Sequence, residues 1–157
     1  MNAVRWHVRP VRPDEFDQWA ALFRGYAEFY QWELSEAQTL EIWRWIHEDR
    51  TIEALVALGV NEDGDEVGPM AGLSHVRTWV RPLRATVNGY LDDLYVDPEH
   101  RGTGCVDAMF DALRQLGAER GWSVVRWTTA QGNIRAQAAY DRVASRTTWV
   151  TYDLTVE

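Results

Sequence analysis

A glycine-rich turn between an apolar strand and an amphipathic helix constrains the fold of this chain more than any other feature. The strand-like run over residues 90–96 ends at Asp97-Pro98, and Arg101-Gly102-Thr103-Gly104 follows. Apolar residues then recur at helical spacing over residues 106–116. Glycines let a backbone approach an anion, and a helix N-terminus presents unsatisfied N–H groups, so the turn predicts a phosphate site. Taken alone, it is equally compatible with a tight turn that only caps the helix.

Two common phosphate motifs do not fit this turn. A P-loop requires a lysine after its last glycine, and the chain contains no lysine among its 16 basic residues. A dinucleotide fingerprint requires a third glycine where this chain has Asp107. Arg101 adds a positive charge at the mouth of the turn.

The remaining pattern predicts an alternation of strands and helices. Asp14 is the predicted N-cap of the first helix, and Ser35-Glu36-Ala37-Gln38 has the form of a capping box that opens the second. The order predicts an antiparallel half followed by a parallel pair, which makes the fold class mixed α/β. Strands are expected at residues 4–9, 52–60, 70–80, 90–96, 123–128 and 147–156, and helices at about 16–30, 35–47, 105–117 and 133–143.

Length and composition narrow the class of protein. A chain of 157 residues with 46% apolar content suits one domain, residues 1–157. A net charge of -8 argues against a nucleic-acid partner. The single cysteine, Cys105, excludes an intrachain disulfide, and the four histidines lack metal-binding spacing, so no metal is expected. Without a long apolar run or a signal peptide, we expect a cytoplasmic protein with no membrane partner.

Two segments carry a family resemblance. Residues 91–104 resemble the acetyl-CoA motif of GNAT acetyltransferases, in which a strand ending Leu-x-Val-x-Pro precedes Arg/Gln-x-x-Gly-x-Gly/Ala and a helix. Downstream, Asn133-x-x-Ala136-x-x-Ala139-Tyr140-Asp141 resembles the second signature of that family. Two departures are Val106, where the family has Gly or Ala, and Ala144-Ser145, which replaces Gly-Phe. Val106 retains its backbone N–H and belongs to the apolar face of its helix.

The resemblance implies a fold, an activity and a cofactor site. The implied fold is a mixed, mostly antiparallel sheet that is splayed at the centre and has helices on both faces. The implied activity moves an acetyl group from acetyl-CoA to a primary amine by direct attack, with a backbone N–H near Val96 facing the oxyanion. The residues implied to bind acetyl-CoA are Leu94, Tyr95, Val96, Arg101, Gly102, Thr103, Gly104, Cys105, Val106, Asn133, Ala136 and Tyr140.

Tyr140 and Asp92 are the candidate catalytic residues. Helical spacing alone favours Tyr140 as a core residue, but the resemblance implies that it protonates the leaving thiolate, a role that suits a phenol of pKa ~10. Asp92 is a candidate base or ammonium ligand, and a purely structural carboxylate is the alternative. Asp92 and Asp93 are adjacent on a strand, so we expect them to point to opposite faces. An acyl-cysteine route through Cys105 lacks a neighbouring His or Asn motif.

The substrate is constrained less closely. Tyr26 and Tyr30, with Trp32, end the first helix in a region that the family uses for substrate, although core packing is equally compatible. Asp92 and Asp93 are the other substrate candidates. The resemblance is greatest to the polyamine and diamine acetyltransferases and to the fungal histone-acetyltransferase-like or D-amino-acid acetyltransferases. It implies a homodimer and a small amine such as a polyamine, amino acid or aminated antibiotic. A protein lysine or N-terminal acetyltransferase and a non-catalytic acyl-CoA sensor are the alternatives.

Overall fold

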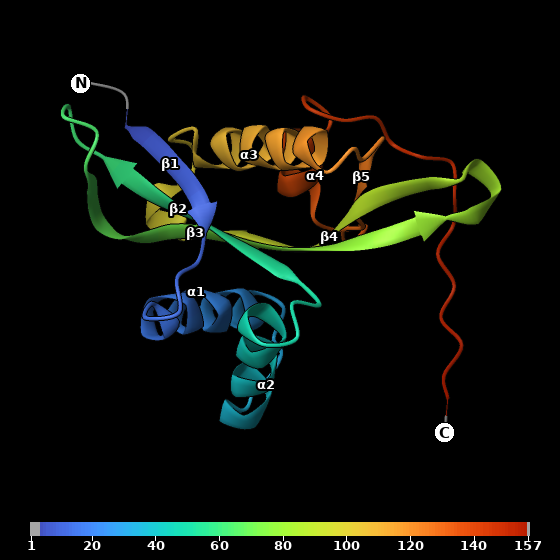
Figure 1. The fold of residues 1–157 in the computed structure, drawn as a ribbon, viewed down its shortest axis with the longest axis horizontal. Coiled ribbons are helices and arrows are strands. Elements are labelled where there is room, and N and C mark those ends of the chain that lie inside the picture. Colours follow the sequence, from blue (N-terminus) through green and yellow to red (C-terminus); the bar gives the residue numbers. More distant parts are fainter. Residues whose placement is uncertain (1–3, 157) are drawn as a thin grey trace. The chain divides into compact units, whose positions relative to one another are not determined.

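The computed structural model describes residues 4–156, and the chain divides into two compact units. The first, here called the sheet unit, ends at Trp127, and the C-terminal unit begins at Thr128. Figure 1 shows the elements of both units. The sheet unit contains, in order, β1 (Arg5–Pro10), α1 (Phe16–Phe29), α2 (Glu36–His47), β2 (Glu53–Val60), β3 (Glu66–Arg81), η1 (Pro82–Arg84), β4 (Thr86–Val96), η2 (Pro98–His100), α3 (Cys105–Glu119) and β5 (Val125–Arg126).

The five strands form one sheet in the order β1-β2-β3-β4-β5. The first four pair antiparallel, and β5 pairs parallel to β4 through Gly89 and Tyr90. β5 has two residues where the sequence predicted a strand over 123–128. The rest of β4, from Leu91 to Val96, has no ladder partner on its β5 side among the described residues. The sheet is therefore splayed at this point, and the predicted mixed α/β class is confirmed.

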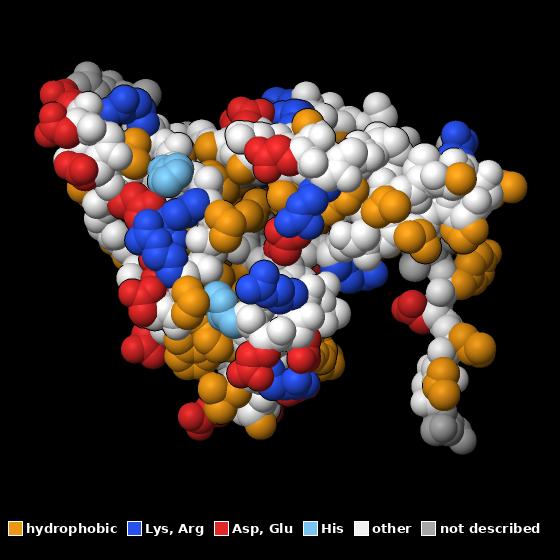
Figure 2. All heavy atoms as spheres, viewed as in Figure 1, with side chains coloured by type: hydrophobic (Ala, Val, Ile, Leu, Met, Phe, Trp, Pro, Cys, Tyr) orange, Lys and Arg blue, Asp and Glu red, His pale blue; other side chains and the backbone are white. Residues whose placement is uncertain are grey.

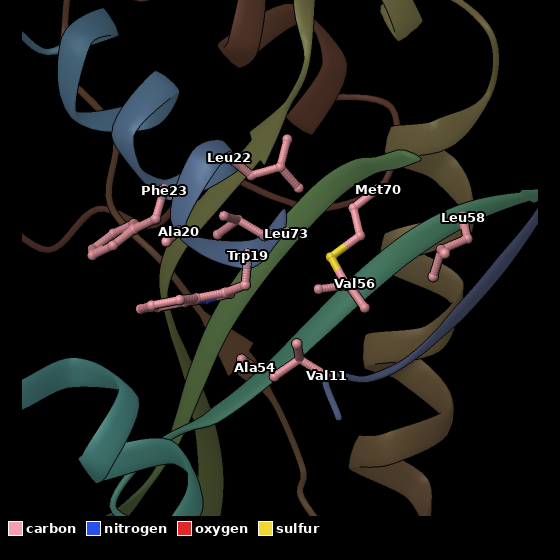
Figure 3. Close-up of a cluster of buried hydrophobic side chains, with 10 residues drawn as sticks. All are labelled: Val11, Trp19, Ala20, Leu22, Phe23, Ala54, Val56, Leu58, Met70 and Leu73. Atoms are coloured by element: carbon pink, nitrogen blue, oxygen red, sulfur yellow. The ribbon is translucent and has the colours of Figure 1, made fainter. Parts of the chain in front are cut away.

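Helices cover both faces of the sheet. α1 packs on one face through Trp19, which is completely buried in a cluster with Val56 and Leu73 (Figure 3). On the other face, Met109 and Cys105 of α3 belong to a cluster that also contains β-strand residues. Burial of each large apolar side chain stabilises the fold by about 1.5–3 kcal/mol. These two clusters hold β3 and β4, which carry most of the candidate site, between layers of helix (Figure 1).

The helix caps follow local sequence signals in one case and tertiary contacts in another. The capping box is confirmed, because Gln38 N donates to Ser35 Oγ at 3.1 Å and Ser35 N donates to Gln38 Oε1 at 2.9 Å. The prediction of Asp14 as N-cap is wrong: Glu15 takes that position, without a side-chain cap bond. The Glu15 carboxylate instead accepts two hydrogen bonds from Arg9, at 2.7 and 2.9 Å, so an ion pair with β1 sets the start of α1.

Charged side chains of both signs occupy the surface drawn in Figure 2. Acidic groups gather at the turn between β2 and β3 and again around the end of α2 (Figure 2). Within residues 4–156, no helix is both long and apolar enough to span a bilayer.

The C-terminal unit contains one short helix, α4 (Ile134–Tyr140). Asn133 caps it, with Ala136 N donating to Asn133 Oδ1 at 3.3 Å. The predicted strand over residues 147–156 is wrong, because no part of this segment that the structure describes joins a ladder. A strand requires a partner for its backbone groups, and the alternating apolar pattern that suggested it supplies none. A single domain over residues 1–157 stays a prediction.

Candidate active site

The glycine-rich turn presents bare backbone in front of α3. Gly102 and Gly104 have φ of +78° and +86°, the left-handed region in which side chains are strained. A Cβ built on either glycine meets nothing within 4 Å. Both the conformation and the open space in front of it suit an approaching ligand.

The turn is held in place from two sides. Trp6 Nε1 of β1 donates to the Thr103 carbonyl at 3.1 Å, and Thr103 Oγ1 donates to the His100 carbonyl at 2.6 Å. α3 then begins at Cys105, and the first amides of an α-helix have no acceptor within the helix. A fixed turn and a helix N-terminus together present backbone geometry that suits an anion and exists before any ligand arrives.

Two residues at the start of α3 pack inward to different degrees. Val106 is partly buried against the cluster that contains Met109 and Cys105, as its place on the apolar face predicted. Cys105 is 1% exposed, and burial raises the pKa of its thiol to about 12. A thiol with this pKa stays protonated at neutral pH, which argues against Cys105 as an acyl carrier.

Arg101 connects the turn to β4 and α1. Its Nε donates to the Val96 carbonyl at 3.0 Å. Its guanidinium carbon lies 5.7 Å from the ring centroid of Tyr95 and 5.8 Å from that of Phe29. These contacts fix the position of the positive charge beside the C-terminal end of β4.

The C-terminal part of β4 directs backbone groups toward its unpaired edge. Asp97 N donates to the Ala71 carbonyl of β3 at 2.9 Å. Backbone groups of successive strand residues alternate between the two edges, so the N–H groups of Val96 and Leu94 point away from β3. That is the edge along which no strand is paired among the described residues.

A bulge in β4 brings Asp92 and Asp93 to one face of the sheet. His75 pairs with Asp93 and Val76 with Leu91, which leaves Asp92 as the extra residue. Asp92 Oδ2 accepts a hydrogen bond from Arg77 Nε at 2.9 Å, while Asp93 Oδ2 lies 2.8 Å from His75 Nδ1.

Arg77 and His75 are two residues apart on β3 and therefore share a face. The prediction that the two carboxylates point to opposite faces is wrong, because alternation holds only in a regular strand and a bulge interrupts it.

Asp92 has a partly exposed carboxylate with a perturbed affinity for protons. Partial burial raises the pKa of Asp92 above its ordinary value, and the hydrogen bond from Arg77 opposes this rise. Its side chain is 32% exposed. A raised pKa moves a carboxylate toward the range useful for proton transfer, although the Arg77 pair is also compatible with a structural role.

Asp93 ends a buried chain of hydrogen bonds that sequence reasoning did not find. Trp19 Nε1 donates to His75 Nε2 at 2.9 Å, and the side chains of both residues are buried. Because an indole N–H can only donate, His75 Nε2 is the acceptor and its proton is on Nδ1. His75 Nδ1 therefore donates to Asp93. The sequence offered only a histidine without metal spacing, so no signal pointed to this chain.

A cavity of about 640 Å³ lies beside Asp93. Tyr26 and Tyr30, the predicted substrate residues of α1, both line it. Asp92 is not part of the lining, and α2 contributes several residues that sequence reasoning missed. The lining residues are Phe23, Tyr26, Ala27, Tyr30, Trp32, Leu34, Ala37, Gln38, Glu41, Ile42, Trp45 and Asp93.

Three predicted site residues belong to the C-terminal unit. Asn133 caps α4, Ala136 lies in its first turn, and Tyr140 is its last residue. Their predicted roles toward acetyl-CoA stay predictions. Among residues 4–156, no three His, Cys, Asp or Glu side chains form a group that could hold a metal ion.

Comparison with known proteins gives a consistent family. The sequence profile of the acetyltransferase (GNAT) family matches residues 19–144. The chain is 30% identical over 147 residues to the D-amino-acid N-acetyltransferase HPA3 of Saccharomyces cerevisiae, covering 92% of this chain and 88% of the relative. It is 26% identical over 139 residues to the thialysine N-epsilon-acetyltransferase of Caenorhabditis elegans, covering 88% and 81%.

Solved structures share the fold at lower sequence identity. A probable acetyltransferase superposes with a TM-score of 0.81 at 21% identity over 96% of this chain and 99% of that one. The aminoglycoside acetyltransferase AAC(6')-Iy, solved with a bisubstrate analogue of CoA, superposes with a TM-score of 0.80 at 14% identity over 97% and 99%. With the profile and the relatives in agreement, this chain belongs to the GNAT family and is an N-acetyltransferase.

Proposed function

We propose that this enzyme transfers the acetyl group of acetyl-CoA to the primary amine of a small molecule. The observation that carries the proposal is the bare glycine turn at the N-terminus of α3, in the same unit as a cavity whose lining includes the Asp93 carboxylate. The turn suits the phosphates of CoA, and the cavity suits an amine.

The residues proposed to bind acetyl-CoA contact two chemically different parts of it, the pyrophosphate and the pantetheine arm. Backbone amides of Gly102, Thr103, Gly104, Cys105 and Val106 are proposed to hold the pyrophosphate. Along the unpaired edge of β4, backbone groups of Leu94 and Val96 are proposed partners for the amide groups of the pantetheine arm, and Tyr95 lies between these two residues. Arg101 adds a positive charge beside that edge. Asn133 and Ala136 are proposed to contact the arm from the C-terminal unit.

Direct transfer requires three functions of the protein. Asp92, whose pKa is raised, is proposed to take a proton from the substrate ammonium, directly or through water. The freed amine nitrogen then attacks the thioester carbonyl carbon, and the Val96 N–H donates to the developing oxyanion. Collapse breaks the carbon–sulfur bond, and Tyr140 donates its phenolic proton to the leaving thiolate. The nitrogen loses its second proton to solvent as the amide forms, and solvent restores the proton of Tyr140.

Release of free thiol from acetyl-CoA tests the proposal. We expect thiol release to depend on added amine, and small amines to support a higher kcat/KM than a lysine-containing peptide or a peptide N-terminus. Preference for a peptide would identify a protein acetyltransferase. Acetyl-CoA binding without turnover on any amine or peptide would identify a sensor and contradict the proposal.

We also propose that the enzyme is a homodimer. Val150, Tyr152, Leu154 and Val156 alternate with polar residues and are 73–91% exposed. Such a segment matches a strand that needs a partner, and a second copy of the chain supplies one. Sedimentation at micromolar concentration should give twice the 18.1 kDa chain mass. Tyr152→Pro should shift the equilibrium toward monomer, because proline blocks a ladder bond. A wild-type protein that sediments only as monomer would refute this assembly.

A further inference from the structure

The cavity between α1 and α2 contains two acidic residues whose charges are compensated differently. The lining described above includes Glu41 and Asp93 but neither arginine nor histidine. The Glu41 carboxylate accepts hydrogen bonds from Arg44 Nε at 3.1 Å and Nη2 at 2.7 Å, and from Trp45 Nε1 at 2.9 Å. A guanidinium therefore pairs with Glu41, and the same guanidinium also pairs with Asp49, which is outside the lining, at 2.8 Å.

The charge of Asp93 has no such balance. Its partner is the His75 ring, whose Nε2 accepts the Trp19 N–H at 2.9 Å. A protonated His75 would direct an N–H group at the indole N–H, and this contact is buried on both sides. Trp19 thus keeps His75 neutral, and the Asp93–His75 pair retains one negative charge.

Neighbouring groups do not change this count. Asp92, the carboxylate next along β4, is paired with Arg77 at 2.9 Å. Within the lining, Asp93 is therefore the carboxylate that no guanidinium pairs with. The walls of the cavity are mostly aromatic and aliphatic, with Phe23, Tyr26, Tyr30, Trp32, Ile42 and Trp45 among them.

We propose that this cavity selects an amine with one positive charge, no carboxylate and an apolar, ring-bearing body. This inference rests on the proposed acetyl transfer to a small amine. The ammonium binds Asp93, which His75 and Trp19 hold in place, and the apolar body packs against Tyr26 and Tyr30. The volume of about 640 Å³ is within the usual range for drug-sized ligands, so a ring fits.

The same arrangement disfavours two other classes of amine. In a polyamine, the second ammonium would meet Glu41, whose carboxylate is already paired with Arg44. Attraction between this ammonium and the aromatic faces of the cavity is weaker than the cost of removing water from the ammonium. The carboxylate of an amino acid finds no cation in the lining and is repelled by Asp93.

Three probes of different charge test the selection. With saturating acetyl-CoA, we expect the kcat/KM of phenylethylamine to exceed those of spermidine and D-phenylalanine by at least tenfold. The same order is expected for binding measured by calorimetry without acetyl-CoA. If no amine is acetylated, the proposed function fails, while the calorimetric order still decides this inference. Equal or tighter binding of spermidine or D-phenylalanine would overturn it.

Arg44→Met provides a gain-of-function test. Arg44 pairs with Glu41 and with Asp49 at the exposed surface, and exposed ion pairs contribute little to stability, so its loss should leave the fold intact. Freed of its partner, Glu41 can accept a second ammonium, and we expect the spermidine/phenylethylamine ratio of kcat/KM to rise about tenfold. The double variant Arg44→Met/Glu41→Gln should lose this rise. Arg114→Met, which removes a similar pair on α3, is the control. If the spermidine/phenylethylamine ratio of kcat/KM is unchanged in Arg44→Met, the pairing of Arg44 with Glu41 is not what disfavours a second ammonium.

Asp93→Asn tests the ammonium ligand itself. The amide oxygen can still accept the hydrogen bond from His75, so the buried chain is preserved. We expect KM for phenylethylamine to rise at least tenfold with a smaller change in kcat, because binding of the charge is lost. A folded Asp93→Asn enzyme with the wild-type KM would exclude Asp93 as the ligand.

Discussion

Gly104→Asp should lower acetyl-CoA affinity about 10²–10⁴-fold. The substitution places a side chain and a negative charge in the open space in front of α3, where the phosphates are proposed to bind. Two charge-assisted hydrogen bonds lost at about 1.5–3 kcal/mol each account for a loss of this size. Isothermal titration of the folded variant with acetyl-CoA measures the effect.

The matched control for this variant is Gly64→Asp. Gly64 also has a positive φ, of +93°, and open space around its Cβ, but it lies in the turn between β2 and β3. Both variants therefore carry the same backbone strain and added charge. Acetyl-CoA affinity should fall only in Gly104→Asp. If affinity in Gly104→Asp stays at the wild-type value, the glycine turn is a helix cap and not a phosphate site.

Tyr140→Phe should lower kcat about 10²-fold while KM changes little. General acid catalysis contributes about 10²–10⁴-fold, and the proton moves only in the transition state. The loss should be at the low end, because a leaving thiolate of pKa ~8.5 departs partly without help. The ring is retained, so unfolding free energy should change by about 1 kcal/mol or less. Single-turnover measurement isolates the chemical step.

Tyr152→Phe is the control for the loss of a hydroxyl in the same unit. Tyr152 is 89% exposed and has no proposed role in proton transfer. An acetyl donor with a more acidic thiol should also reduce the difference in kcat between wild type and Tyr140→Phe, since such a thiolate leaves without accepting a proton. Wild-type kcat in folded Tyr140→Phe, with chemistry rate-limiting, would leave Tyr140 as a core residue only.

Local signals in the sequence were sufficient for the glycine turn and for the caps at Ser35 and Asn133, but not for the N-cap of α1. Gly102 and Gly104 have the left-handed φ that their place in the motif predicted. Ser35 and Asn133 cap their helices through backbone groups three residues away. These features depend on hydrogen bonds between residues close in the chain, so the pattern that encodes them is visible in a short window. The family signatures belong to the same category.

Contacts between distant residues decided the side of the candidate site that contains the cavity. The Trp19–His75 and His75–Asp93 hydrogen bonds join residues 56 and 18 positions apart. No periodicity marks such a chain, because each residue by itself reads as an ordinary core or strand residue.

Dependence on distant residues also explains why the predicted strand over residues 147–156 and the predicted faces of Asp92 and Asp93 were wrong. Alternation predicted opposite faces for Asp92 and Asp93, but whether a strand contains a bulge depends on its pairing with β3. The alternating segment over residues 147–156 encodes a preference for a strand, but a ladder forms only where a second strand is available. The sequence by itself determined the helices, the Ser35 and Asn133 caps and the conformation of the glycine turn, since these depend on near neighbours. The tertiary structure decided the register, the face of each carboxylate and the cavity, because each of these requires partners from distant segments.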